Sequence, residues 1–130
     1  MTRLIGLGIA ASLLVSAASH GYLYLHGYSS IPSIGRGFLV LTSLFVALAI
    51  LIAVGGPAWL RAVALVAALG SIVAFALSRT VGLQGFLERG WQPAPHALIS
   101  VLAEAITVAL CAWSLLRTGS AVRRSRTATT

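Results

Sequence analysis

Four long apolar runs, separated by short segments that contain glycine, proline and polar residues, set the pattern of this chain. Each run approaches the roughly 20 mostly apolar residues that a helix needs to cross a bilayer. The runs cover residues 4–25, 38–54, 59–77 and 97–116. Between the second and third runs, Gly55-Gly56-Pro57 marks a tight turn. The pattern predicts an all-α membrane protein with four transmembrane helices in a compact bundle over residues 1–116.

Composition indicates the same class. Of the 130 residues, 58% are hydrophobic and 8% are charged, against roughly 25% charged residues in a soluble domain. So few charges cannot cover a surface that faces water on all sides. Five of the nine arginines lie at the two chain ends, outside the apolar runs. The basic excess therefore does not form the continuous patch that nucleic acid requires, and we do not expect nucleic acid as a partner.

The arginines also predict the orientation of the chain. With four spans, both termini lie on one side of the membrane, and that side holds six arginines. The opposite side holds only Arg36, Arg79 and Arg89. Because arginine is enriched in cytoplasmic loops, we expect cytoplasmic termini and a multi-pass protein of the bacterial plasma membrane.

The last residues carry the densest positive charge. Residues 117–130 show no apolar periodicity and predict a basic, disordered cytoplasmic tail. We expect its arginines to contact anionic lipid headgroups, at about 1 kcal/mol for each residue near the surface. They are Arg117, Arg123, Arg124 and Arg126. The simpler alternative is that these arginines only fix the topology of the last span.

The first span has a second interpretation, as a cleaved signal peptide. Arg3 gives a positive start, residues 4–15 an apolar core, and Ser16-Ala17-Ala18 a possible cleavage site. The apolar run continues past that site through residues 21–25, and cleavage would leave three spans. We therefore favour a membrane span and keep cleavage as the alternative.

Polar residues at membrane depth are the candidate functional residues, and Glu104 comes first. It lies about two turns inside the fourth span, where a carboxylate is costly unless it is protonated, paired or facing a cavity. Arg79 ends the third span on the same side and is the expected partner. Ser100, His20 and His96 complete the candidate cluster. The cluster either fixes helix register or forms a proton or cation site.

Small residues predict how the helices pack. Helices in lipid associate through small side chains that let their backbones approach closely. In the first span, Gly8, Ser12, Ser16 and His20 recur every four residues and therefore lie on one helical face. This face is the expected contact surface of the first helix.

The histidines open a further possibility. His20, His26 and His96 lie toward the outer half of the membrane, and imidazoles at one depth can bind haem or a metal ion. However, their sequence spacing is not that of a compact ligand pair, and Cys111 is the only cysteine. We expect no cofactor, with haem or metal binding as the alternative.

The longest connection is the outer loop of residues 78–96. It mixes apolar residues with glycines and a local Glu88–Arg89 charge pair. Connections of this length inside a compact bundle are often functional. Its candidate surface residues are Gly82, Leu83, Phe86 and Trp91. They would serve either as a lid over a cavity or as a docking surface for a partner.

Several of these segments together carry a resemblance. They are His20-x5-His26-Gly27-Tyr28 with Ile31-Pro32, Ser78-Arg79-Thr80 with Gly82-Leu83 and Phe86, and Glu104. With them the whole chain resembles the small, uncharacterised four-span integral membrane proteins of high-GC Gram-positive bacteria. The resemblance implies the four-span architecture and adds no chemistry.

Function is therefore an open choice among three hypotheses. The chain holds no nucleophile–base set and no phosphate-cradling glycine loop, so we do not expect an enzyme. The leading hypothesis is a non-enzymatic accessory or assembly subunit of a larger membrane complex, or a small homo-oligomer. The alternatives are a small proton-coupled transporter centred on Glu104 and a haem- or metal-binding membrane protein.

Overall fold

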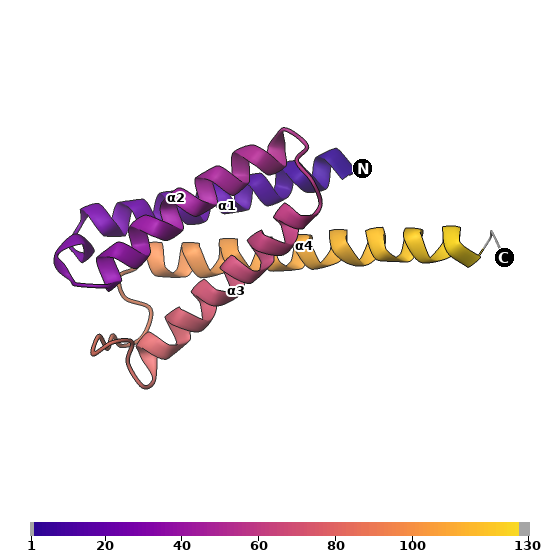
Figure 1. The fold of residues 1–130 in the computed structure, drawn as a ribbon. Coiled ribbons are helices and arrows are strands. Elements are labelled where there is room, and N and C mark those ends of the chain that lie inside the picture. The colour runs from indigo at the N-terminus through magenta and orange to yellow at the C-terminus, as the bar shows by residue number, and fades with distance from the viewer. Residues whose placement is uncertain (1, 128–130) are drawn as a thin grey trace.

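The structure, a computed structural model, describes residues 2–127 as a bundle of long helices (Figure 1). Within this range the chain forms four α-helices and one short 3-10 turn, η1. They are α1 (Thr2–Leu25), η1 (Tyr28–Ser30), α2 (Ile34–Ala53), α3 (Trp59–Arg79) and α4 (His96–Thr127). Each α-helix contains a segment that is long and apolar enough to cross a membrane. The predicted class, an all-α membrane bundle, is confirmed.

The beginning of α2 differs from the sequence-based expectation. The helix begins at Ile34 rather than at residue 38. Its first turn packs on η1, where Ile34 and Tyr28 are both buried. Gly35 makes this contact possible, because a Cβ there would meet the backbone of Tyr28 and Ser29 at 3.1 Å or less. Packing, rather than hydrophobicity, therefore sets the start of α2.

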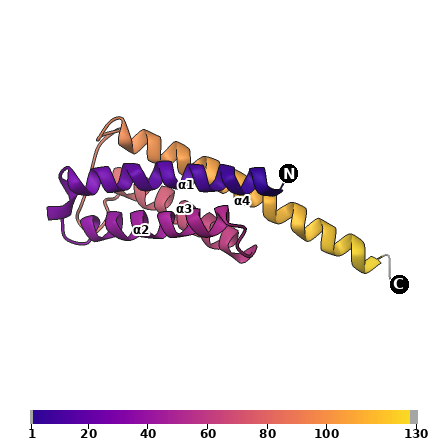
Figure 2. The ribbon, with the colours of Figure 1, turned by 90° about the horizontal axis from the view of Figure 1, so that it is seen from above.

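The end of α4 requires a correction. The sequence predicts a disordered tail from residue 117, whereas the helix continues to Thr127 (Figure 2). Arginine and alanine favour helix, and no proline occurs after residue 116. The helix therefore continues beyond the end of the apolar run. Residues 128–130 and the side chains of Arg123, Arg124 and Arg126 lie outside the described residues. Their contact with lipid headgroups stays a prediction.

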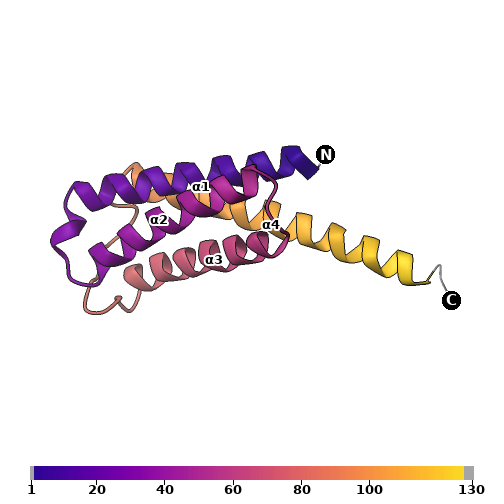
Figure 3. The same cartoon turned by 45° about the horizontal axis from the view of Figure 1, so that its top comes forward.

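The four helices pack unequally. α1 packs against α2 and α4, and α3 packs against α4, whereas α2 and α3 make the smallest helix–helix contact of the bundle. α2 and α3 are joined by the short turn near Pro57 (Figures 1 and 3). The bundle is therefore least tightly closed between α2 and α3.

The interface between α1 and α4 uses the small residues that the sequence indicated. A Cβ on Gly8 would lie 3.2 Å from Leu110, and the hydroxyl oxygens of Ser12 and Thr107 are 2.7 Å apart. One turn further on, Ser16 meets Glu104. The predicted packing face of the first helix is confirmed.

Two apolar clusters lie on either side of this polar contact. The larger one holds Ile9, Leu13, Phe45 and Leu60. The smaller one is centred on Leu23, Tyr28 and Ile34, next to the loop between α1 and α2. Glu104 lies between these clusters along the bundle, so an ionisable residue is placed where the protein itself, rather than lipid, surrounds it.

Candidate functional site

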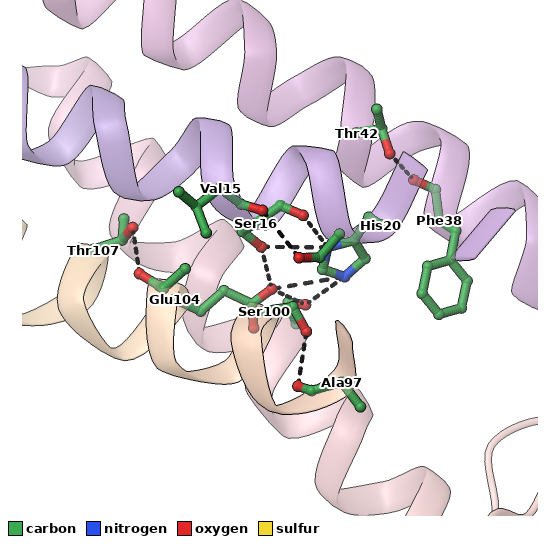
Figure 4. A network of polar contacts seen from close by, with 12 residues as sticks. Val15, Ser16, His20, Phe38, Thr42, Ala97, Ser100, Glu104 and Thr107 are labelled. Atoms are coloured by element: carbon green, nitrogen blue, oxygen red, sulfur yellow. Dashed lines mark hydrogen bonds and ion pairs between the residues drawn. The ribbon is translucent and has the colours of Figure 1, made fainter. Parts of the chain in front are cut away.

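Glu104 is at the centre of the site and is almost fully enclosed, with 1% of its surface exposed. Its Oε1 atom accepts hydrogen bonds from the hydroxyls of Ser16 on α1, at 2.8 Å, and Ser71 on α3, at 2.9 Å. The Nε2 atom of His20 lies 3.7 Å from the same oxygen (Figure 4). Three helices thus converge on one carboxylate oxygen.

The second carboxylate oxygen has a different environment. Among the described residues no hydrogen bond reaches Oε2, although Glu104 is buried. Glu104 lines the cavity described below, and a carboxylate oxygen that no protein donor reaches can accept a proton, a water molecule or a ligand there. Oε2 is therefore the atom at which this site has unused binding capacity.

His20 is held in one orientation. Its Nδ1–H donates to the backbone carbonyl of Ser16, at 2.9 Å. A carbonyl oxygen only accepts, so Nδ1 carries a hydrogen in both the neutral and the charged imidazole. Nε2 is then the nitrogen that gains or loses a proton. It faces Glu104 at 3.7 Å and the Ser71 hydroxyl at 3.5 Å.

A partly open cavity of about 210 Å³ reaches this carboxylate. Its inner end is formed by Glu104, His20, Ser71 and Ser100. Most of the remaining wall is apolar and includes several aromatic rings. These rings belong to Tyr28, Phe38, Phe75 and Phe86. The cavity therefore combines a polar end with an apolar, aromatic body.

The loop between α3 and α4, residues 80–95, covers the outer end of the cavity, and we call it the lid. Leu83 and Phe86 pack against the cluster of Leu23, Tyr28 and Ile34. Both also line the cavity, together with Gln84. Of the four predicted loop surface residues, these two point inward. Gly82 supplies a turn at φ +84°, and Trp91 is exposed with its ring 5.6 Å from that of Phe75.

Three side chains, which we call the latch, hold the lid down. Glu88 lies 2.7 Å from the Arg79 guanidinium and accepts a hydrogen bond from the Tyr28 hydroxyl. Arg79 also donates to the backbone carbonyls of Gly90 and Gln92. Burial and the Glu88 hydrogen bond raise the pKa of the Tyr28 phenol, so the phenol keeps its proton and donates.

The latch corrects two pairings that the sequence predicted. Arg79 does not pair with Glu104, because its guanidinium bonds to Glu88 and to the lid backbone. Glu88 pairs with Arg79 rather than with its neighbour Arg89. Arg79 and Glu104 nevertheless line the same cavity, at its two ends.

The histidines separate rather than converge. His20 joins Glu104, whereas His26 and His96 stack on Tyr22, with ring centroids 3.9 and 4.0 Å apart. The predicted inclusion of His96 in the Glu104 cluster is therefore wrong. Among the described residues no group of three histidine, cysteine, aspartate or glutamate side chains is placed to hold a metal ion. The arrangement does not support the alternative of a shared histidine metal site.

Some site residues were not indicated by the sequence as members of the cluster. Ser100, which the sequence placed in the cluster, lines the cavity with Glu104, and its hydroxyl donates to the backbone carbonyl of Ala97. Ser71 and the latch residue Tyr28 were not assigned to that cluster. A serine in an alanine-rich helix gives little signal. Tyr28 carries only the general signal of an aromatic residue near a span end.

No protein-family model, curated protein or solved structure matches this chain.

Proposed function

We propose that this protein is a small proton-coupled carrier in which Glu104 alternately holds a proton and a small organic cation. The observation that carries the proposal is the cavity that leads to the buried Glu104 carboxylate. A carrier needs such a route between its coupling residue and the outside. An accessory subunit that uses Glu104 only to fix helix register does not.

Charge balance supports the exchange of one cation for one proton. An uncompensated charge inside a membrane bundle costs several kcal/mol, so Glu104 and His20 favour a net charge of zero. One shared proton achieves this, either on the carboxyl group or on Nε2 of His20, 3.7 Å away. A monovalent cation beside Oε2 supplies the same charge. Its entry is therefore favourable when the proton leaves.

The lining of the cavity favours a cation with an apolar body. Phe38 and Phe86 present aromatic rings, and a ring face attracts a cation by about 0.5–2 kcal/mol. The Phe75 ring also lines the cavity, but the Arg79 guanidinium already lies 4.3 Å from its centroid. The carboxylate would repel an anion. The volume of about 210 Å³ is below the roughly 300 Å³ of the smallest pockets for drug-sized molecules. We therefore propose a small organic ammonium ion as the substrate class.

Binding of benzyltrimethylammonium to the purified protein tests the proposal, because the charge of this ion does not change with pH. While the Glu104–His20 pair holds its proton, linkage predicts that affinity rises about tenfold per pH unit. One proton should leave for each ion bound. Glu104→Gln should abolish binding, whereas the control Ser43→Ala, on the exposed side of α2, should bind normally.

The neutral isostere neopentylbenzene, in which carbon replaces nitrogen, separates charge recognition from simple apolar filling. Equal binding of this compound, or binding of the ammonium ion without proton release, would contradict the proposal. In proteoliposomes with an acidic lumen, the unsubstituted protein should accumulate radiolabelled benzyltrimethylammonium. Vesicles with Glu104→Gln should not.

The accessory-subunit and homo-oligomer hypotheses stay predictions with a different outcome. They are favoured if no ammonium ion binds, if the protein purifies with a larger complex or as an oligomer, and if Glu104→Gln leaves assembly unchanged. A visible absorption band in the purified protein would instead favour haem or metal binding.

We also propose the bacterial plasma membrane as the location, with both termini in the cytoplasm. In a Cys111→Ala background, a cysteine at Gln84 should react with an impermeant maleimide added outside the cell. A cysteine at Thr118 should react only after the membrane is opened. The reverse pattern would invert the proposed topology.

A further inference from the structure

The walls of the cavity differ in how well they are closed. On the side of α1 and α4, His20, Ser100 and Glu104 are buried. On the side of α2 and α3, Gly37 is exposed, and Ala74 is only partly buried. All five residues line the cavity. The open side therefore lies between α2 and α3, where the helix contact is smallest.

The end of the cavity that leads to the aqueous loops is covered by the lid, of which Gln84 lines the cavity and is exposed. Leu83 and Phe86 of the lid pack against the cluster around Leu23 and Ile34. The latch then ties the lid to η1 and α3 through Tyr28 and the ion pair of Arg79 with Glu88. A ligand that entered from water would pass these contacts, whereas a ligand that entered between α2 and α3 would not.

The depth of the open side in the membrane indicates which kind of molecule can reach it. Gly37 is in the first turn of α2, and Phe75 is about one turn before the end of α3. This is the level of a span end, where amphipathic molecules place their polar group. The surrounding helix surfaces are apolar, as Leu39, Val40 and Val73 are exposed.

We infer that the ligand enters sideways from the lipid, through the gap between α2 and α3 beside Gly37 and Phe75, and that it is a membrane-dissolved amphipathic ammonium ion. The ammonium group reaches Glu104 while the alkyl chain extends through the gap into the bilayer. This inference rests on the proposed function and adds to it the entry route. Because the alkyl chain of the ligand lies in the bilayer, the volume of the cavity does not limit the length of that chain.

Substitutions at the gap test the route. A side chain at Gly37 or at Gly70 would meet no neighbouring atom within 4 Å, so Gly37→Leu and Gly70→Leu should both fold. Only Gly37 lines the cavity, which makes Gly70→Leu a matched control. Ala74→Leu narrows the gap independently from the α3 side.

The measurement is the binding kinetics of radiolabelled decyltrimethylammonium to the protein in nanodiscs. Gly37→Leu and Ala74→Leu should slow both association and dissociation by about tenfold while Kd changes little, because a narrowed entrance affects both directions equally. Gly70→Leu should leave both rates unchanged. When Kd is expressed as the free ligand concentration in water, the affinity should rise roughly fourfold for each methylene group added to the alkyl chain of the ligand.

Three outcomes would overturn the inference. If Tyr28→Phe accelerates both rates while Gly37→Leu does not slow them, the ligand enters beneath the lid from water. If Gly37→Leu lowers affinity without slowing association, its side chain fills the cavity instead of the entrance. If affinity does not follow chain length, the ligand does not arrive from lipid. In each case binding that still depends on Glu104 leaves the proposed function intact, whereas absence of that binding refutes the function itself.

Discussion

Ser16 and Glu104 face each other across the α1–α4 interface, and the Ser16 hydroxyl donates to the Glu104 carboxylate at 2.8 Å. This bond joins the first span to the last at the depth where Ser71 of α3 reaches the same oxygen. Glu104 is therefore both the proposed exchange residue and a link among three helices. The two roles have separable consequences.

Replacing Glu104 separates charge from hydrogen bonding. Glu104→Gln keeps an oxygen that accepts both serine hydroxyls, so the free energy of unfolding should change by less than about 1 kcal/mol. Glu104→Leu removes the acceptor and should destabilise the bundle by about 1–2 kcal/mol, given about 0.6 kcal/mol for an average interhelical bond in a membrane. Unfolding in mixed micelles by dodecyl sulfate measures both. Equal stability of the two variants would show that the serine bonds do not stabilise the bundle.

The Ser12–Thr107 contact predicts a measurable coupling between α1 and α4. The two hydroxyls are 2.7 Å apart and buried, so one of them donates across the interface. In a double-mutant cycle, Ser12→Ala and Thr107→Val should show a coupling energy of about 0.5–1.5 kcal/mol. The pair Ser43→Ala and Thr107→Val is the control, because Ser43 is exposed and bonds to its own helix. A coupling of zero for Ser12 and Thr107 would contradict the contact.

Gly8 predicts how closely α1 and α4 must approach. A Cβ added at this position would lie only 3.2 Å from the Leu110 side chain. Gly8→Leu should therefore force the helices apart and cost about 1–3 kcal/mol, the usual penalty for overpacking. Gly70→Leu is the matched control because a side chain there meets open space. Thermal unfolding in detergent measures the difference, and equal melting temperatures would contradict the close packing.

Much of this arrangement could be predicted from sequence, and the failures have a common cause. The four-residue spacing of Gly8, Ser12 and Ser16 identifies a helical face, because helix periodicity is local. The depth of Glu104 follows from counting residues along an apolar run. The partner of Arg79, in contrast, depends on the conformation of the lid. A long side chain at a helix end has several acceptors in reach, and only the folded loop places Glu88 at 2.7 Å.

The end of α4 and the role of Ser71 were missed for related reasons. Hydrophobicity indicates where lipid ends, whereas the helix itself continues to Thr127 as long as its residues favour helix. Ser71 is one of many small residues in α3. Its role depends on the crossing of α3 with α4, which brings its hydroxyl 2.9 Å from Glu104. Neither feature is contained in the local pattern of the chain.

The latch predicts how the lid responds to pH. Burial and then the hydrogen bond to Glu88 raise the pKa of Tyr28 above the ordinary value of about 10. When the lid opens, the phenol returns toward that ordinary value. The latch contribution to closing is therefore complete below about pH 10 and is lost as the pH rises through the higher pKa of the closed lid. Absorbance of the phenolate, as the difference between the unsubstituted protein and Tyr28→Phe, should show ionisation above pH 10.

Trypsin cleavage after Arg89 reports the opening of the lid at neutral pH. Tyr28→Phe removes a hydrogen bond to a charged group, worth about 1.5–3 kcal/mol, and should increase cleavage at Arg89 at least several-fold. Cleavage after Arg117, on the exposed side of α4, is the internal reference and should not change. Glu88→Gln should have the larger effect, because it also leaves Arg79 without its carboxylate. If Arg89 is cleaved equally fast in all three proteins, the lid is held by the packing of Leu83 and Phe86 alone.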